Sequence, residues 1–239
     1  YAQPNAKTDP GEGYNFFPVM WAFGGEFVND KGQVVINTPQ NIAAFKLARD
    51  IYVNQISPNG ANFKDLRNLF AQGVIGFYYD IEMATAPINK ASPKGADFAN
   101  EYSAMVIPAK DGPNGHGYVI QHHSVIFNTS KQPAAAVKFA EFLSGEKVLQ
   151  ILYDAGMGKM PARASLLKMG IFTNPTKPIA KGFVAALPTA RPLPTENKAF
   201  MLADEALCDA LTQCATSKDS VETIVKNLEA RVKQLYGQK

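Results

Sequence analysis

The sequence predicts an α/β fold, and three observations support this prediction. A run of β-branched and aromatic residues at 74–79 is typical of a strand. Segments 38–55 and 221–235 instead carry apolar residues at helical spacing. With 46% hydrophobic and 19% charged residues among its 239, the chain has the composition of an ordinary folded protein and not of a disordered one.

The first part of the chain predicts a loop followed by β structure. Residues 2–13 are rich in Pro, Gly, Asp and Asn, which indicates a loop or a connection. An aromatic stretch, 14–21, then runs into Gly24-Gly25. The sequence 29–32 is typical of a hairpin turn, with 34–36 as the returning strand. We therefore expect a β excursion over this part of the chain.

Helices and strands alternate in the rest of the chain. Thr38 before Pro39 is a predicted N-cap with proline at the first helical position, which opens a helix to about Gln55. The other predicted elements are a short helix ending at Gly73, strand 74–79 closed by Asp80, a helix-like turn stopped by Pro87, strands 102–107, 118–120 and 125–127, a turn at 110–113, and helices 134–143, 146–155, 179–187, 196–211 and 221–235.

Charge and hydropathy argue against two kinds of environment. The net charge is only +3 and the basic residues form no run, so nucleic acid is not an expected partner. No apolar stretch approaches the roughly 18 to 20 residues that a transmembrane helix needs. The sequence begins at Tyr1 without a methionine or a signal sequence, so we expect a processed, trimmed or excised product.

The two cysteines leave two possibilities open. Cys208 and Cys214 lie near an expected helix end. A regular helix would hold them too far apart to bridge, whereas unwinding at Thr212-Gln213 would let a disulfide close. A disulfide and two thiols are both compatible with the sequence.

Catalytic and metal-binding patterns are weak. The sequence has no Gly-rich phosphate loop, no nucleophile elbow and no His-Glu-x-x-His. His122 and His123 are adjacent, and adjacent strand residues point to opposite faces, so one metal site would rarely use both. Asp80 and Glu82 would suit acid–base work only at a separation that the sequence does not give. We therefore predict no catalytic residue, no metal and no cofactor.

Aromatic residues near loops and strand ends are typical of sugar sites. Their rings stack on the apolar faces of a sugar, while polar side chains bond its hydroxyls. The candidates are Tyr14, Phe16, Phe17, Trp21, Tyr78 and Tyr79. Each of them taken alone is more often a core residue. Asp80 closes strand 74–79 where α/β proteins bind ligands, so ligand contact is favoured there over a helix N-cap.

A series of short motifs follows one order along nearly the whole chain. They are the aromatic stretch into Gly24-Gly25, Asn37-Thr38-Pro39, Phe70-Ala71-Gln72-Gly73, Val106-Ile107-Pro108, 131–136 with 139–144, 158–163, and Arg191-Pro192 before two final helices. In this order they resemble the extracellular solute-binding family of ABC importers that includes maltose-binding protein. The order is specific, although no single piece is.

The resemblance implies a periplasmic-binding-protein-like fold with two lobes that close on a ligand between them. It implies that residues 1–117 and 164–239 build the second lobe and that 118–163 cross the hinge into the first. Family members are longer, and residues that would precede Tyr1 build most of their first lobe. Residues 118–163 would then lack most of their sheet partners unless another polypeptide supplies them.

Site positions can be transferred where the motifs match. Tyr14 and Phe17 match aromatics that stack on sugar in the maltose-binding branch, and Trp21 lies in the same segment. Asp80 falls at the strand end where ligand contacts follow Phe-x-Gln-Gly. The expected ligand-binding residues are Tyr14, Phe17, Trp21, Tyr79, Asp80, His122, His123 and Arg163.

Two departures from that branch favour a compact ligand. Met83 and Met201 stand where it has tryptophans, which puts a long maltodextrin in doubt. His122 and His123 replace small residues after the hinge strand, so a bulkier polar wall is expected to narrow the pocket.

The resemblance implies a periplasmic or extracellular protein that binds a mono- or disaccharide and delivers it unchanged to an ABC permease. A polyol or a sugar phosphate is the first alternative, with Arg163 and the histidines as anion contacts. A glycoside-processing enzyme is the alternative from another class.

Overall fold

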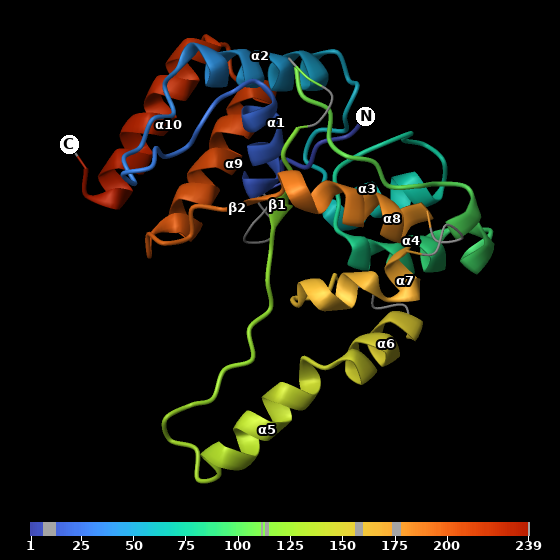
Figure 1. Cartoon of the computed structure of the whole chain (residues 1–239). Coiled ribbons are helices and arrows are strands. Elements are labelled where there is room, and N and C mark those ends of the chain that lie inside the picture. Colours follow the sequence, from blue (N-terminus) through green and yellow to red (C-terminus); the bar gives the residue numbers. More distant parts are fainter. Residues whose placement is uncertain (7–12, 111, 113–114, 156–159, 174–177, 239) are drawn as a thin grey trace. The chain divides into compact units, whose positions relative to one another are not determined.

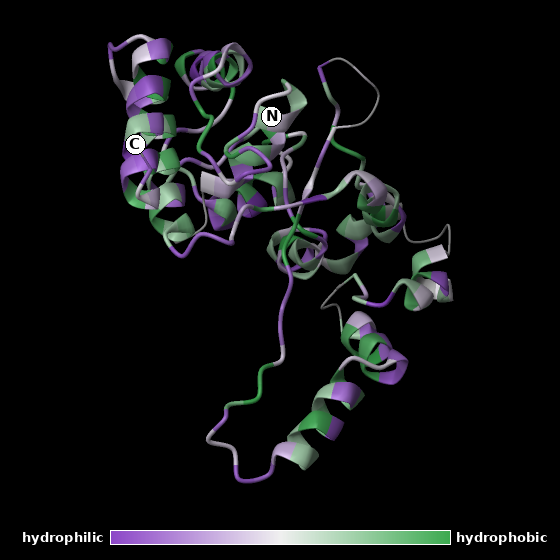
Figure 2. Ribbon diagram, turned by 60° about the vertical axis from the view of Figure 1, so that its left-hand side comes forward, coloured by the Kyte–Doolittle hydropathy of each residue, from purple (hydrophilic) through white to green (hydrophobic). Residues whose placement is uncertain are grey.

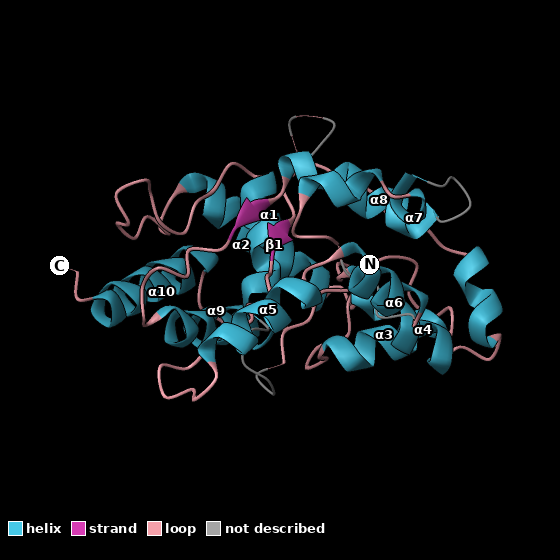
Figure 3. Cartoon of the chain, turned by 60° about the horizontal axis from the view of Figure 1, so that its bottom comes forward, coloured by secondary structure: helices cyan, strands magenta, loops and turns pink. Residues whose placement is uncertain are grey.

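The computed structural model describes residues 1–6, 13–110, 112, 115–155, 160–173 and 178–238. These residues are mainly helical, with two short strands (Figure 3). The chain divides into two compact units. Unit 1 comprises Tyr1–Asp80, Val106–Val119 and Thr189–Lys239, and unit 2 comprises Ile81–Met105 and Ile120–Pro188.

Unit 1 is built around helices α2, α9 and α10, which pack against one another (Figure 1). Their bounds are Pro39–Val53, Phe200–Thr216 and Val221–Tyr236. The unit also contains η1 (Gly13–Phe16), α1 (Phe17–Ala22), α3 (Phe63–Ala71), β1 (Tyr118–Val119) and β2 (Arg191–Pro192). Strands β1 and β2 pair in parallel, with Tyr118 opposite Arg191.

The helix ends in unit 1 follow from local sequence. Thr38 accepts a hydrogen bond from Asn41 N, and Pro39 occupies the first position of α2. Ser220 accepts one from Thr223 N at the start of α10, and Gly237 ends that helix in the left-handed conformation at φ 67°. Polar groups that would otherwise stay unsatisfied at the helix ends are bonded in this way.

The core of unit 1 lies where these helices meet. Its largest fully buried side chains include Phe16, Phe17, Met20, Phe27, Ile36, Phe45, Leu207, Leu211 and Ile224. A second small cluster under α3 contains Ala2, Ala61, Leu66 and Ile75. Burial of these side chains supplies the main favourable term for folding of this unit.

Unit 2 is a series of short helices. They are η2 (Glu82–Ala84), α4 (Thr85–Ala91), η3 (Gly95–Asn100), α5 (Pro133–Leu143), α6 (Glu146–Asp154), η4 (Ala164–Lys168), α7 (Gly170–Thr173) and α8 (Pro178–Ala186), with η5 (Leu187–Thr189) at the junction. Gly182 of α8 lies so close to the Ala104 carbonyl that a Cβ would stand 2.1 Å from its oxygen. Only glycine fits at that contact.

Most predicted helices are confirmed. The helix after Thr38, the helix ending before Gly73 and the two successive helices after Pro133 form where the periodicity placed them. Helix 179–187 corresponds to α8, helix 196–211 to α9, which begins at Phe200, and 221–235 to α10. In the part of the chain that the structure describes, no helix is long and apolar enough to cross a membrane.

The predicted strands are mostly wrong. Among the described residues, segment 74–79 forms one parallel bridge, Ala2 to Tyr78, and Val74 and Phe77 are exposed. Within the described residues, 102–107 and 125–127 form no strand. Strand propensity becomes a strand only where a neighbouring strand offers backbone partners.

The turn predictions have mixed outcomes. Gly32 has φ 70° and Val28 bridges Val34, which confirms the hairpin turn but reduces the returning strand to one bridge. The turn at 110–113, the opening loop and the motif at 158–163 lie partly outside the described residues.

The aromatic stretch 14–21 is helical, so the predicted β excursion is wrong in this part. It forms η1 and α1, with Pro18 in the first turn of α1, where its missing N–H costs nothing. For the same reason Pro87 does not stop a helix, because it lies in the first turn of α4. The cysteine alternatives are decided by α9, which is continuous through Thr212 and holds Cys208 and Cys214 as buried thiols.

Candidate functional site

The predicted site residues divide between the two units. Unit 1 holds Tyr14, Phe17, Trp21, Tyr79 and Asp80, and unit 2 holds His122, His123 and Arg163.

Tyr14, Phe17 and Trp21 lie on one side of the η1–α1 helical segment. Phe17 is only 1% exposed, with its ring 5.5 Å from Trp21 and 5.1 Å from Phe27 between centroids. Tyr14 is half-buried and packs edge-on against Tyr118, at 5.3 Å. Phe17 therefore belongs to the core of this chain, whereas Tyr14 keeps part of its ring at the surface.

Asp80 is bonded on both carboxylate oxygens. Arg67 donates from Nε to Oδ2 and from Nη2 to Oδ1, each at 2.8 Å, and the Tyr78 hydroxyl donates to Oδ2 at 2.7 Å. The Asp80 side chain is 10% exposed, and Arg67 also lies over the Phe63 ring. Hydrogen bonding to Asp80 raises the pKa of Arg67 above its usual value.

The sequence offered ligand contact and a helix N-cap as roles for Asp80, and the structure adds a third, the ion pair with Arg67. The N-cap of the following helix is Ile81, so Asp80 does not cap it. Arg67, 13 residues before Asp80, was missed. It is the one arginine of α3, its side chain is 26% exposed, and no local pattern in the sequence joins it to Asp80.

Tyr79 lies beside Tyr1, with the two rings edge to face at 5.7 Å. Tyr1 in turn donates a hydrogen bond to Gln3 Oε1 at 2.6 Å. Burial raises the pKa of Tyr79 above its ordinary value, so its hydroxyl stays protonated at neutral pH.

Two of the three residues from unit 2, His122 and His123, line one surface hollow, and the third, Arg163, lies near its edge. His122, His123, Glu141 and Ser144 line a hollow of about 390 Å³, and Arg163 Nη2 lies 3.5 Å from Ser144 Oγ. Both histidines reach the same hollow because their segment is irregular, so the alternation expected for a strand does not apply. Within the described residues, no group of three His, Cys, Asp or Glu side chains could hold a metal ion.

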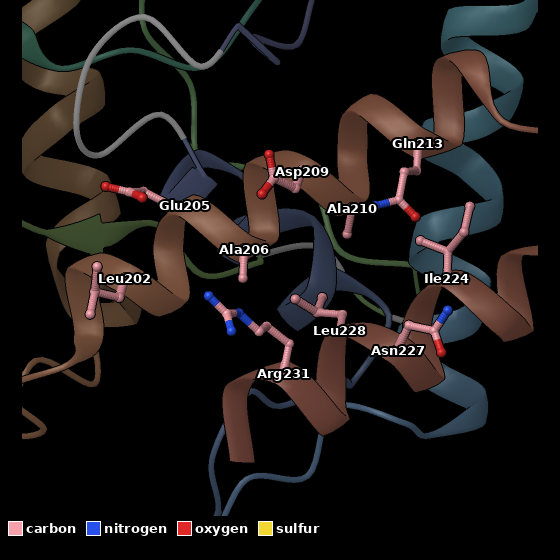
Figure 4. Close-up of a pocket in the computed structure, with 10 residues that line it drawn as sticks. All are labelled: Leu202, Glu205, Ala206, Asp209, Ala210, Gln213, Ile224, Asn227, Leu228 and Arg231. Carbon is pink, nitrogen blue, oxygen red and sulfur yellow. The ribbon is translucent and has the colours of Figure 1, made fainter. Parts of the chain in front are cut away.

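A second hollow, of about 340 Å³, lies on unit 1 between α9 and α10 (Figure 4). Ala206, Ala210, Ile224 and Leu228 form its apolar part, and its polar part is Glu205, Asp209, Gln213, Asn227 and Arg231. This groove was not predicted from the sequence. Its signal was the recurrence of Glu205, Asp209 and Gln213 every four residues along one face of a helix.

Comparisons with known proteins identify the chain's relatives. The model of the bacterial extracellular solute-binding protein family matches residues 2–150. A Brucella abortus (strain 2308) protein, named provisionally as a binding protein, is 27% identical over 221 residues, which cover 90% of this chain and 51% of that protein. The chain thus spans about half the length of the curated relatives it matches.

Solved structures show the same fold. An ABC transporter solute-binding protein from Thermotoga lettingae TMO, bound with α-D-tagatose, has a TM-score of 0.81 at 21% identity. The match covers 99% of this chain and 59% of that protein's chain. The sugar-binding protein MalE from Xanthomonas citri has a TM-score of 0.80 at 18% identity, with coverage of 99% and 58%. This likeness confirms the predicted α/β, periplasmic-binding-protein-like fold class.

Proposed function

Because the chain belongs to the bacterial extracellular solute-binding protein family, we propose that it binds a sugar or a similar small polar solute and delivers it unchanged to an ABC transporter permease. The family match over residues 2–150 is the observation that carries this proposal. Binding would take place outside the cytoplasm, in the periplasm or at the cell surface. The protein would act as a carrier and not as an enzyme.

The proposed ligand contacts on unit 1 are Tyr14 and Asp80, together with Tyr79, which precedes Asp80 in the sequence. Tyr14 offers a partly exposed ring, and Asp80 offers a carboxylate that Arg67 and Tyr78 hold in place. A ring face and a fixed carboxylate are the two kinds of group that a sugar uses. Phe17 and Trp21 would support Tyr14 from within the core.

A polyol or sugar phosphate is the second candidate, and the unit 2 hollow favours it. Two imidazoles and the Ser144 hydroxyl line one space of about 390 Å³, and the Arg163 guanidinium contacts that hydroxyl. The imidazoles and the guanidinium can donate to an anionic or heavily hydroxylated solute, while the Glu141 carboxylate in the same lining would accept from hydroxyls. The ligand class is therefore best tested with neutral and phosphorylated sugars side by side.

We further propose that residues 1–117 and 164–239 form one lobe and that 118–163 complete another, with the rest of that lobe supplied by an amino-terminal part. The apolar side chains of this segment support the proposal. Val125, Phe127 and Phe139 are 70%, 74% and 61% exposed, and Phe142 is 52% exposed. Figure 2 shows such hydrophobic residues among hydrophilic ones along α5. Large apolar side chains left exposed within one segment are typical of an interaction site.

The test is titration calorimetry on an assembly that contains this chain and an amino-terminal part from a relative of full length. Neutral sugars, polyols and sugar phosphates are titrated in turn, and turnover is assayed in parallel. Saturable binding with the ligand recovered intact is the expected result. Conversion of the ligand would instead favour the alternative function, a glycoside-processing enzyme. The absence of binding to all three classes of solute would refute the proposal.

A further inference from the structure

The guanidinium of Arg191 is fixed by two other side chains of unit 1. Its Nη1 donates to Glu26 Oε1 at 2.8 Å and its Nη2 to Glu26 Oε2 at 3.0 Å. The same group lies over the ring of Trp21, with Cζ 4.7 Å from the centroid. Trp21 is 7% exposed and packs against Phe17 in the core. A planar, forked cation can satisfy both partners at once, which a lysine cannot do.

The backbone of Arg191 belongs to the parallel pair of β1 and β2. Arg191 N donates to Gly117 O at 2.8 Å, and Arg191 stands opposite Tyr118. His116 Nδ1 lies 2.7 Å from Thr189 O, which adds a contact between the two segments just before each strand begins. Each strand is only two residues long, and so short a pair has little stability of its own. Side chains must therefore hold it.

β1 has a similar attachment on its own side. The Tyr118 hydroxyl donates a hydrogen bond to Asn15 Oδ1, and its ring packs on Tyr14. Asn15 is fully buried, and Gln3 Nε2 donates to its carbonyl at 3.3 Å. The paired strands are thus attached through Trp21 and Glu26 on one side and through η1 on the other.

Strands β1 and β2 lie where the chain passes between the two units. The chain passes into unit 2 twice, over 81–105 and over 120–188, and Val119 and Thr189 flank the second, longer passage. The strand just before this passage, β1, therefore pairs with the strand that follows it, β2, within unit 1. Whatever holds Arg191 holds both connections.

We infer that the Glu26–Arg191–Trp21 stack is the anchor that positions on unit 1 the paired segments through which the chain leaves this unit after Val119 and re-enters it at Thr189. The side chains of Arg191 and Glu26 are 36% and 40% exposed, so solvent screens their attraction and the pair adds little to overall stability. Its effect is local, on backbone position. The inference requires neither a ligand nor the proposed carrier function.

One consequence concerns Trp21. The ring face that Arg191 covers cannot stack on a sugar at the same time, so the emission of this single tryptophan reports on the anchor. It therefore gives an optical signal that is independent of backbone measurements.

The experiment is hydrogen exchange with mass spectrometry on the whole chain, with Arg191→Lys and Glu26→Gln compared with wild type. Arg191→Lys keeps the charge and removes the forked, stacked geometry, and Glu26→Gln keeps Arg191 and removes the ion pair. The control is Glu222→Gln, which breaks the exposed pair with Lys46 in the same unit. Exchange is read in peptides covering 115–121 and 188–194, and in α9 and α10.

Both anchor variants should speed exchange in the two strand peptides by about tenfold, or about 1.4 kcal/mol of local opening free energy, and leave α9 and α10 unchanged. Trp21 emission should change in both, and the control should change neither signal. Altered emission with unchanged exchange at 115–121 would overturn the inference. Equal acceleration in α9 and α10, or in the control, would overturn it too, because the stack would then be a general stabiliser. Glu26→Gln decides the matter if Arg191→Lys does not fold.

Discussion

The phenylalanines in the core of unit 1 and those in segment 120–143 of unit 2 occupy opposite environments. In unit 1, Phe17 and Phe45 are 1% and 0% exposed within the core formed by α2, α9 and their neighbours. In unit 2, Phe127, Phe139 and Phe142 are 74%, 61% and 52% exposed. A phenylalanine gains about 1.5 to 3 kcal/mol from full burial, so each exposed ring leaves most of that gain unused. The core of unit 1 buries its phenylalanines, whereas those of segment 120–143 are exposed, so we expect this segment to pack against another surface.

Helix ends show the same difference. Thr38 and Ser220 accept backbone hydrogen bonds at the starts of α2 and α10. Gln132 and Gly145, which lie at the starts of α5 and α6 in the described part of unit 2, make no such side-chain bond. Local sequence therefore stabilises the starts of α2 and α10 more strongly than the starts of α5 and α6.

The largest effect should come from adding the proposed amino-terminal part, which would cover the exposed apolar side chains of segment 120–143. Alone, the chain should associate with itself in light scattering, and Phe139→Lys combined with Phe142→Lys should shift it toward the monomer. It should bind sugar only weakly alone and at least about a hundredfold more tightly with the amino-terminal part, because that part adds a second wall and excludes water.

The matched control is the exposed pair Val53→Lys and Leu47→Lys on α2, which should leave association unchanged. A monomeric wild-type chain that binds sugar at micromolar affinity without help would contradict this prediction. It would also contradict the proposed division into lobes.

The second largest effect compares two phenylalanines directly. Phe45→Ala should lower the free energy of unfolding by about 3 to 5 kcal/mol, because it opens a cavity in a packed core. Phe139→Ala should change it by less than about 0.5 kcal/mol in the chain alone. Urea unfolding followed by circular dichroism and Trp21 emission measures both. Similar losses for the two variants would show that the exposed ring already has a partner.

Sequence patterns predicted the helices better than the strands, for a physical reason. A helix such as α2 bonds within itself, so its N-cap, its proline and its apolar period are all local signals. Segment 74–79 has the right residues for a strand, yet Ala2 is the only bridge partner that the described residues give it. Strand pairing depends on distant segments, which a local pattern cannot report.

The candidate site shows the same limit. The carboxylate of Asp80 was recognisable from its place after the aromatic run, but its two-pronged bond to Arg67 requires the fold of α3. The stack of Arg191 on Trp21 joins residues that are 170 positions apart in the sequence. The residue types were therefore predictable, and their partners were not.

A third prediction tests whether Asp80 contacts ligand or only holds Arg67. In the assembly with both lobes, Asp80→Ala should weaken binding by about 1.5 to 3 kcal/mol, the range for loss of a charge-assisted hydrogen bond. Arg67→Gln removes the same ion pair and leaves the carboxylate, so it should weaken binding less. Titration calorimetry gives both affinities, and thermal melting gives both stabilities. Equal affinity losses in the two variants would assign Asp80 to the ion pair alone.

The smallest expected effect is the loss of unfolding free energy when a helix cap is removed, compared between α10 of unit 1 and α5 of unit 2. Ser220→Ala removes the bond to Thr223 N at the start of α10 and should lower the free energy of unfolding by about 1 kcal/mol. Gln132→Ala at the start of α5 removes no capping bond that the structure describes, so its change should stay within about 0.3 kcal/mol. Urea unfolding of the two variants beside wild type measures the difference. If Gln132→Ala lowers the free energy of unfolding as much as Ser220→Ala, then Gln132 caps α5 in solution. The start of α5 would then not differ from the starts of α2 and α10.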